Sequence, residues 1–151
     1  MKRDYDSVYR QLSALLEGEN DPVVRMAETA AIVREAFGFW WTGFYRVAPL
    51  ASGAGSELLL GPFQGPVACI HIPYGKGVCG TAWARRETVV VPDVEQFPGH
   101  IACSSESRSE IVVPVFGPDG TVTAVLDIDS RDLGAFSQDD VPGLERIASL
   151  L

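Results

Sequence analysis

The chain has 151 residues, 46% of them hydrophobic, and its 20 acidic against 12 basic residues give a formal net charge of −8. This length can bury a continuous core, so we expect one domain over residues 1–151, and the negative charge opposes the counterion release that drives nucleic-acid binding. No run approaches the roughly 18 apolar residues of a membrane span and no secretory signal opens the chain, so we expect no membrane contact and a cytoplasmic location.

Apolar residues repeat at helical spacing twice before the first glycine-rich segment. The first repeat predicts a helix over residues 4–17 that ends near Gly18. A second helix is predicted to begin at Asp21, which can cap it, with Pro22 in its first turn, and to end at Gly38.

From Phe39 the apolar period changes to two, which indicates strands. The first strand, "FWWTGFYRV", leads into a loop of alanine, glycine, serine and proline over residues 48–56. Further along the chain we expect strands at 57–61 and 66–72 with "GPFQGP" as the turn between them, a short helical stretch within 73–87, and a short apolar run at 88–93.

Residues 109–116 and 121–129 form the clearest hairpin, with residues 117–120 as its turn. The last element is a helix from a Ser137 cap to Leu151. Together these elements predict an α+β fold: a largely antiparallel sheet of five or six strands with helices packed on one face.

Cys103 lies in a polar loop instead of an apolar strand. Ser104 and Ser105 follow it, and the Pro98-Gly99 turn precedes it, which indicates an exposed thiol. Because buried free cysteines behave as small hydrophobic residues, an exposed one calls for a chemical role. Three cysteines in a chain expected in the cytoplasm disfavour a permanent disulfide framework and leave transient redox chemistry or metal ligation open.

Asp127 and Asp129 are two residues apart in a predicted strand, so their side chains project from the same face. Crowded carboxylates repel each other, which raises the pKa of at least one toward the range where it can deliver a proton. Glu110, on the partner strand of the hairpin, can join them. The hypothesis is that this cluster binds the ammonium group of a small molecule and supplies an acid; the alternative is an ordinary solvated strand face.

Short sequence blocks in a characteristic order carry a resemblance to a known family. They are "WWTGFY" at 40–45, "GKGVCGTA" at 75–82, "VPDVEQFPGHIAC" at 91–103, "SEIVVPV" at 109–115, "LDIDS" at 126–130 and the ending "FSQDD...LERIASLL". With them, the chain resembles the free methionine-(R)-sulfoxide reductases, a family of stand-alone GAF domains. Pro142-Gly143, near the start of the last helix, departs from the pattern.

The resemblance implies a GAF-like domain that reduces the R epimer of free methionine sulfoxide to methionine. It implies no cofactor, with thioredoxin or another dithiol as the reductant, and a homodimer. Cys103 is similar to the cysteine that attacks the sulfoxide sulfur and becomes a sulfenic acid. Cys69 and Cys79 match the two that can resolve this sulfenic acid as a disulfide, and the sequence leaves the choice between them open.

The remaining site residues also come from the resemblance. Trp41 and Tyr45 resemble an aromatic wall that takes the methyl-sulfoxide end of the substrate, and Glu110, Asp127 and Asp129 match an acidic cluster that holds and polarises it. From the residues alone, the sequence slightly favours Trp41 and Tyr45 as core or sheet-surface aromatics.

Two other functions stay open at this stage. A non-catalytic sensor ranks second, because GAF-like domains often bind small molecules to control an output domain, although none is found within these residues. Tetrahedral zinc ranks third, because the ligand types are present without a CxxC or HxxxH spacing, and we expect no metal. The candidate zinc ligands are Cys69, Cys79, Cys103, His71 and His100. Cys69 is also consistent with a buried strand residue, and we assign the two histidines no other role.

Overall fold

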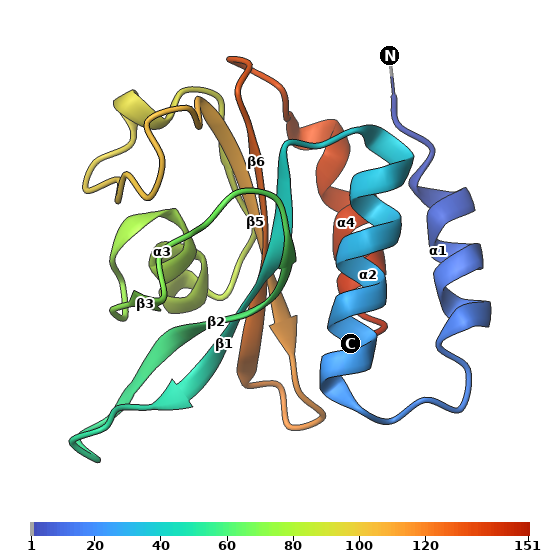
Figure 1. Cartoon of the computed structure of the whole chain (residues 1–151), viewed down its shortest axis with the longest axis horizontal. Coiled ribbons are helices and arrows are strands. Elements are labelled where there is room, and N and C mark those ends of the chain that lie inside the picture. Colours follow the sequence, from blue (N-terminus) through green and yellow to red (C-terminus); the bar gives the residue numbers. More distant parts are fainter. Residues whose placement is uncertain (1) are drawn as a thin grey trace.

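The computed structural model describes residues 2–151. Within them one six-stranded sheet forms the centre of the molecule, in the order β3-β2-β1-β6-β5-β4, and every neighbouring pair is antiparallel (Figure 1). The strands are β1 (Trp41–Pro49), β2 (Ser56–Gln64), β3 (His71–Ile72), β4 (Val89–Val91), β5 (Ser109–Phe116) and β6 (Val122–Ser130).

Three helices lie on one side of this sheet, as predicted, and a fourth lies on the other side (Figure 1). The helices α2 (Pro22–Phe37) and α4 (Val141–Ala148) pack directly on the sheet, and α1 (Tyr5–Leu15) packs on the outer side of these two helices. On the opposite face, α3 (Gly77–Arg85) packs on β5 and β6. Short 3-10 turns, η1 (Val94–Gln96) and η2 (Gln138–Asp140), complete the fold. The α+β prediction is confirmed, and α3 adds a layer that the sequence did not indicate. Within the described residues no helix is long and apolar enough to span a bilayer.

Helix α2 begins and ends at the residues predicted from the sequence. The Asp21 side chain accepts hydrogen bonds from the backbone N–H groups of Val23 and Val24, and Pro22 occupies the first turn, where a missing N–H costs nothing. Gly38 ends the helix in the left-handed conformation, with φ +67°.

The sheet is buried on both faces, so alternate residues of its central strands enter two different cores. Ile111 and Leu126 belong to the core under α1, α2 and α4, whereas Val112 and Val125 belong to the core under α3. Polar residues that alternate with the first set therefore face α3, away from solvent.

The structure corrects two predictions around β2 and β3. β2 continues to Gln64, so most of the predicted turn "GPFQGP" is strand; Pro62 falls where the pairing with β1 shifts register, a position that tolerates its missing N–H. The predicted strand 66–72 shrinks to His71–Ile72. Its apolar residues gave a misleading signal, because Val67 is 89% exposed and Ile70 59% exposed in a loop.

The unusual Pro142-Gly143 pair has a packing reason. Proline suits the first turn of α4, and a Cβ built on Gly143 would lie 2.5 Å from the Tyr5 side chain. Tyr5 also donates a hydrogen bond to Asp140 at 2.7 Å, which ties α1 to the start of α4. Gly143 therefore allows α1 and α4 to approach closely.

Candidate active site

Strand register brings the predicted acidic cluster together on the face that α3 covers. Asp129 of β6 is paired with Trp41 of β1 on one side and with Glu110 of β5 on the other. Asp127, two residues earlier on β6, lies in the next row on the same face. Residues that are about 20 and 90 positions apart in the chain thus meet because three strands are adjacent in the sheet.

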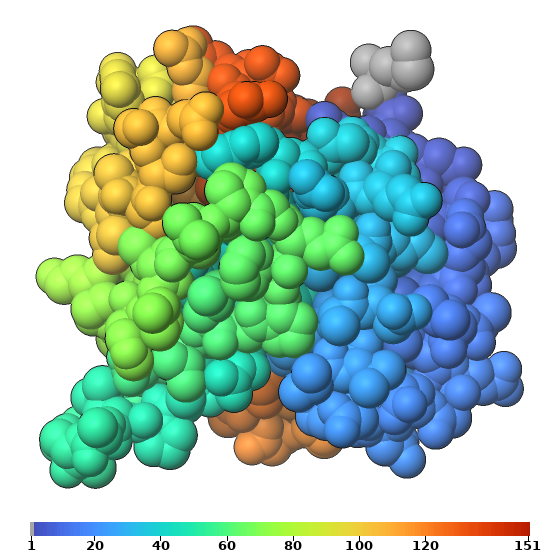
Figure 2. Space-filling view, viewed as in Figure 1, coloured from blue at the N-terminus to red at the C-terminus, as the bar shows by residue number. Residues whose placement is uncertain are grey.

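These residues lie in a narrow pocket of about 50 Å³ that opens to solvent. Figure 2 shows the green segment around residue 70 meeting the yellow-to-orange segment around residues 95–108 on this face of the molecule. The pocket is lined by Trp40, Trp41, Tyr45, Val67, Ala68, Ile72, Lys76, Gly77, Val78, Cys79, His100, Ile101, Cys103, Ser104, Ser107, Glu110, Asp127 and Asp129.

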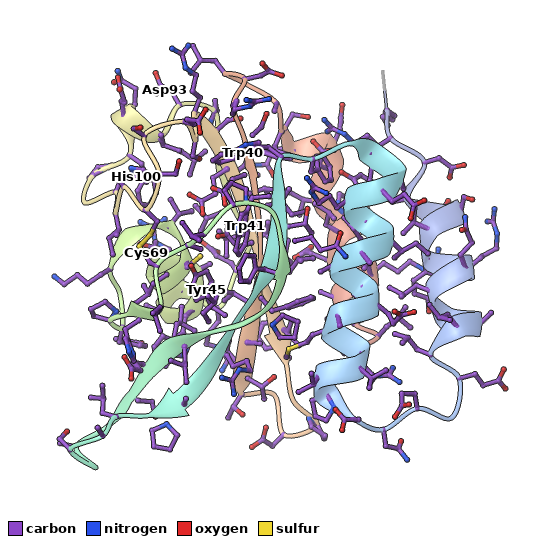
Figure 3. All side chains as sticks on the ribbon, viewed as in Figure 1. Trp40, Trp41, Tyr45, Cys69, Asp93 and His100 are labelled. Atoms are coloured by element: carbon purple, nitrogen blue, oxygen red, sulfur yellow. A yellow bond between two sulfur atoms is a disulfide. The ribbon has the colours of Figure 1, made fainter. Side chains whose placement is uncertain are left out.

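Cys69 and Cys103 are joined by a disulfide, with Cα atoms 5.3 Å apart. Cys103 is exposed, as predicted, and Cys69 is half-buried in the loop before β3, so the interpretation of Cys69 as a buried strand residue is wrong. In Figure 3, Trp41, Tyr45, Cys69 and His100 all lie on the side of the sheet away from α2. The bonded pair therefore lies at the pocket, and Cys103 forms part of its lining.

Cys79 has a different environment from the other two cysteines. It is a free, buried thiol on α3, and its Sγ lies 3.9 Å from Oε2 of Glu110. Burial raises the pKa of the Cys79 thiol well above 9.0, and the neighbouring Asp127 and Glu110 carboxyls raise it further. A protonated thiol is a poor nucleophile, so Cys79 is not activated for attack in this state.

The two aromatic residues hold the loop that carries Cys69. The Trp41 indole N–H donates to the Pro66 carbonyl at 2.9 Å, and the Tyr45 hydroxyl donates to the Cys69 carbonyl at 2.8 Å. The Trp41 ring also stacks on Phe63, with centroids 5.2 Å apart. Both rings line the pocket while fixing the position of Cys69, which the core-aromatic alternative alone does not explain.

Gly43 is a site residue that sequence reasoning missed. A Cβ at this position would lie 2.8 Å from the Trp41 indole and 2.3 Å from the Phe63 Cβ. The missing side chain lets the Trp41 ring lie over β1 and reach the pocket. Its place inside a predicted strand was the available signal, because a glycine there often marks a close approach.

The three carboxyl groups are crowded; Glu110 and Asp127 are shielded from water, and Asp129 is half-buried. Glu110 is 6% exposed and Asp127 5% exposed. Burial is the main cause that raises the pKa of Glu110, and Asp127 and Asp129 add to it; burial likewise raises the pKa of both aspartates. Ser107 donates to Asp129 at 3.2 Å, but Oδ1 of Asp127 is buried without a hydrogen-bond partner. The solvated-face alternative is therefore wrong for Glu110 and Asp127.

His100 is the second missed residue, since the sequence gave it no role. Its Nε2 lies 4.0 Å from Oε1 of Glu110, and within residues 2–151 no lysine or arginine forms an ion pair with the cluster. Burial lowers the pKa of His100, although Asp127 opposes this. His71 instead pairs with Glu57 at 2.9 Å and does not line the pocket.

The zinc set considered from the sequence is not assembled. Two of its three sulfurs are bonded to each other, and His71 is engaged with Glu57. A different group, Cys79, Glu110 and Asp127, has ligand atoms within 4.8 Å of one another. The pocket thus brings a disulfide-bonded cysteine pair close to buried carboxyl groups whose pKa is raised. Reducing a sulfoxide requires a thiol and a nearby acid.

Comparison with known proteins agrees with this geometry. The GAF domain family model matches residues 21–151. GAF domain-containing protein A of Dictyostelium discoideum is 47% identical over 150 residues, covering 99% of this chain and 91% of that protein. The free methionine-R-sulfoxide reductase of Saccharomyces cerevisiae is 42% identical over 142 residues, covering 91% and 77%.

A solved structure extends the similarity to the whole fold. The free methionine-R-sulfoxide reductase of Neisseria meningitidis, determined in complex with its substrate, superposes with a TM-score of 0.89 at 50% identity. The match covers 97% of this chain and 84% of that one.

Proposed function

This chain belongs to the GAF domain family and groups there with the free methionine-R-sulfoxide reductases, which are oxidoreductases, and we propose that it reduces free L-methionine-(R)-sulfoxide to L-methionine. The observation that carries the proposal is the Cys69–Cys103 disulfide at a pocket whose floor holds Glu110 and Asp127. An electrophile bound there would contact a thiol from one side and an acid from the other.

Cys103 is the attacking residue in this proposal, because it is exposed and lines the pocket. Its thiolate attacks the sulfoxide sulfur while a buried carboxyl donates a proton to the oxygen. The oxygen passes to the Cys103 sulfur, so the products are methionine and a Cys103 sulfenic acid. The sulfoxide is reduced by two electrons and the thiol is oxidised by two.

Glu110 is the proton donor we favour. Its pKa is raised by burial first and by both aspartates next, so it holds its proton to a higher pH than an exposed glutamate does. The pKa values of Asp127 and Asp129 are raised as well, and these two residues complete the cluster. A carboxyl of the cluster that ionises carries a negative charge, which can bind the ammonium group of the substrate.

Cys69 resolves the intermediate in this scheme. Its thiolate attacks the Cys103 sulfur, the hydroxyl leaves as water after protonation, and the disulfide forms. The bonded pair in the structure supports Cys69 over Cys79, whose thiol is buried and whose pKa is raised. Thioredoxin or another dithiol then reduces the disulfide by exchange. Separately, the homodimer expected from the family resemblance stays a prediction.

A steady-state assay tests the proposal. The protein is mixed with racemic free methionine sulfoxide and a thioredoxin reducing system, and both epimers are followed by chromatography. We expect only the R epimer to disappear, and the Cys103→Ser variant to be inactive. N-acetylated methionine sulfoxide serves as the comparison substrate, and we expect it to react poorly because it lacks the ammonium group.

Binding without turnover separates the alternatives. If wild type binds free methionine sulfoxide in calorimetry but consumes neither epimer, the reductase assignment is wrong and the ligand-binding sensor replaces it. If Cys103→Ser retains turnover, the assignment of the attacking cysteine is wrong.

A further inference from the structure

We propose that the floor of the pocket is also a binding site for a thiophilic divalent cation such as Zn²⁺, with Cys79, Glu110 and Asp127 as ligands. One ligand atom from each residue lies within 4.8 Å of the other two, and all three side chains are buried. The metal binding itself does not depend on the proposed reaction; only its competition with the sulfoxide substrate does.

The spacing is close to what one zinc ion needs. Zinc–sulfur and zinc–oxygen bonds of about 2.3 Å and 2.1 Å at a tetrahedral angle separate the two ligand atoms by about 3.6 Å. The Cys79 Sγ lies 3.9 Å from Oε2 of Glu110, so a shift of a few tenths of an ångström brings both into range. The two carboxyls lie on adjacent strands, which holds them on one side of the ion.

Asp127 supplies an independent indication of a ligand. Its Oδ1 is buried and has no hydrogen-bond partner, although the side chain is 95% shielded and lines the pocket. A buried acceptor left unpaired costs free energy unless a proton donor or a cation occupies the space before it. The ammonium group of the substrate, which donates hydrogen bonds, and a metal ion are both able to satisfy this acceptor, which is why the two should exclude each other.

His100 lies next to this group of three and can provide a fourth ligand if its ring moves toward the ion. Its Nε2 lies 4.0 Å from Oε1 of Glu110, and its side chain lines the same pocket. One thiolate, one imidazole and two carboxylates form a donor set that zinc accepts and that Mg²⁺ or Ca²⁺, which prefer oxygen alone, do not.

The site is independent of the redox state of the other cysteines. Because Cys69 and Cys103 are bonded to each other, Cys79 is the sole free thiol of the oxidised chain. Metal binding therefore persists in the oxidised protein, where the attacking cysteine cannot react. In the reduced protein the ion occupies the floor on which the sulfoxide must lie, so thiophilic cations inhibit the reaction by competition.

Cobalt titration of the oxidised protein tests the site without any activity measurement. Co²⁺ bound to a thiolate gives a charge-transfer absorption, and Cys79 is the sole thiol available to produce it. We expect a band that saturates at one Co²⁺ per chain, is displaced by Zn²⁺ and is unaffected by Mg²⁺. The nearly isosteric Cys79→Ser variant should lack the band, and Asp127→Asn should bind Co²⁺ at least about tenfold more weakly.

Controls keep the outcome decisive. Asp139→Asn removes an exposed carboxyl and should leave the cobalt affinity unchanged, and circular dichroism establishes that each variant is folded. An absent band in folded wild type, or an equal affinity in wild type and Asp127→Asn, overturns the metal site.

The competition is tested separately in the Cys69→Ser/Cys103→Ser variant, which cannot turn over. Added free methionine sulfoxide should displace Co²⁺ from it. If the cobalt band is retained at saturating sulfoxide, the claim that metal and substrate compete for the same site is wrong, although the metal site itself is not contradicted.

Discussion

Cys69 and Cys103 are bonded to each other across 34 residues of sequence. The loop that carries Cys69 is held at the pocket by hydrogen bonds from two aromatic side chains, so the pairing does not depend on a flexible approach of the two sulfurs. A resolving cysteine needs this kind of placement, because its thiolate must reach the sulfenic acid before a second oxidant does.

Replacing Cys69 by serine should trap the intermediate. After one turnover, Cys69→Ser accumulates the Cys103 sulfenic acid, which dimedone labels and mass spectrometry locates. Cys79→Ser should instead form the Cys69–Cys103 disulfide and give no dimedone adduct at Cys103. If the two variants exchange these behaviours, Cys79 is the resolving residue.

Glu110→Gln should lower activity and raise stability. Loss of the proton donor should reduce kcat by about 10²- to 10⁴-fold. Because the folded state raises the pKa of Glu110 above 4.5, this carboxyl stabilises the fold below that pH, and its contribution is lost as pH rises through the folded pKa. The variant should therefore gain roughly 1–3 kcal/mol of unfolding free energy at pH 8 and little at pH 4.

Denaturant unfolding at both pH values measures this effect, with Glu17→Gln as the control for removing an exposed carboxyl. If the gain in unfolding free energy is equal at pH 4 and pH 8, or if Glu17→Gln shows the same gain, the account that burial and crowding destabilise the ionised Glu110 is wrong.

Asp140→Asn should show the opposite pH dependence. Burial alone would raise the pKa of Asp140, but hydrogen bonds from Tyr5, Ser137 and Arg3 outweigh it and hold the pKa below 3.8. Because its pKa is lower in the folded state, the ionised Asp140 carboxylate stabilises the fold above pH 3.8. This stabilisation is lost as the pH falls through the pKa that Asp140 has in the folded protein. We expect a loss of about 1–3 kcal/mol at pH 7 that shrinks near pH 3, measured by urea unfolding.

The neighbouring Asp139→Asn is the matched control, since Asp139 is exposed. A loss at pH 7 that persists unchanged at pH 3 would show that Asp140 acts by shape alone.

Gly143→Ala should destabilise the protein although alanine favours helices. Alanine gains up to about 1 kcal/mol of helix propensity, but its Cβ would lie 2.5 Å from the Tyr5 side chain. Displacing that ring should cost about 1–3 kcal/mol in overpacking and weaken the Tyr5–Asp140 hydrogen bond. A thermal melt in which Gly143→Ala is more stable than wild type would show that α1 shifts freely.

Local patterns predicted the parts of the fold that local chemistry decides. The hairpin of β5 and β6 was placed almost to the residue, because its strands alternate and its turn has a strong signal. The same alternation placed Asp127 and Asp129 on one face. Cys103 was predicted to be exposed from its polar neighbours alone, and it is.

The remainder of the site depends on contacts between distant segments, which no local pattern contains. An apolar run predicted a buried strand around Cys69, whereas hydrogen bonds from Trp41 and Tyr45 hold a loop there. Similarly, His100 has no sequence neighbour that reveals the pocket, because residues of α3 and of the loop after η1 complete the pocket over the sheet face that carries the carboxyl groups.

A single-turnover experiment tests the central claim most directly. Fully reduced protein is mixed with excess racemic free methionine sulfoxide without any reductant, and methionine, both epimers and the disulfide bonds are quantified. We predict that methionine forms in equal amount to the Cys69–Cys103 disulfide, entirely from the R epimer, and that Cys103→Ser forms none. Loss of the S epimer, or methionine formed without that disulfide, would contradict the proposed reaction.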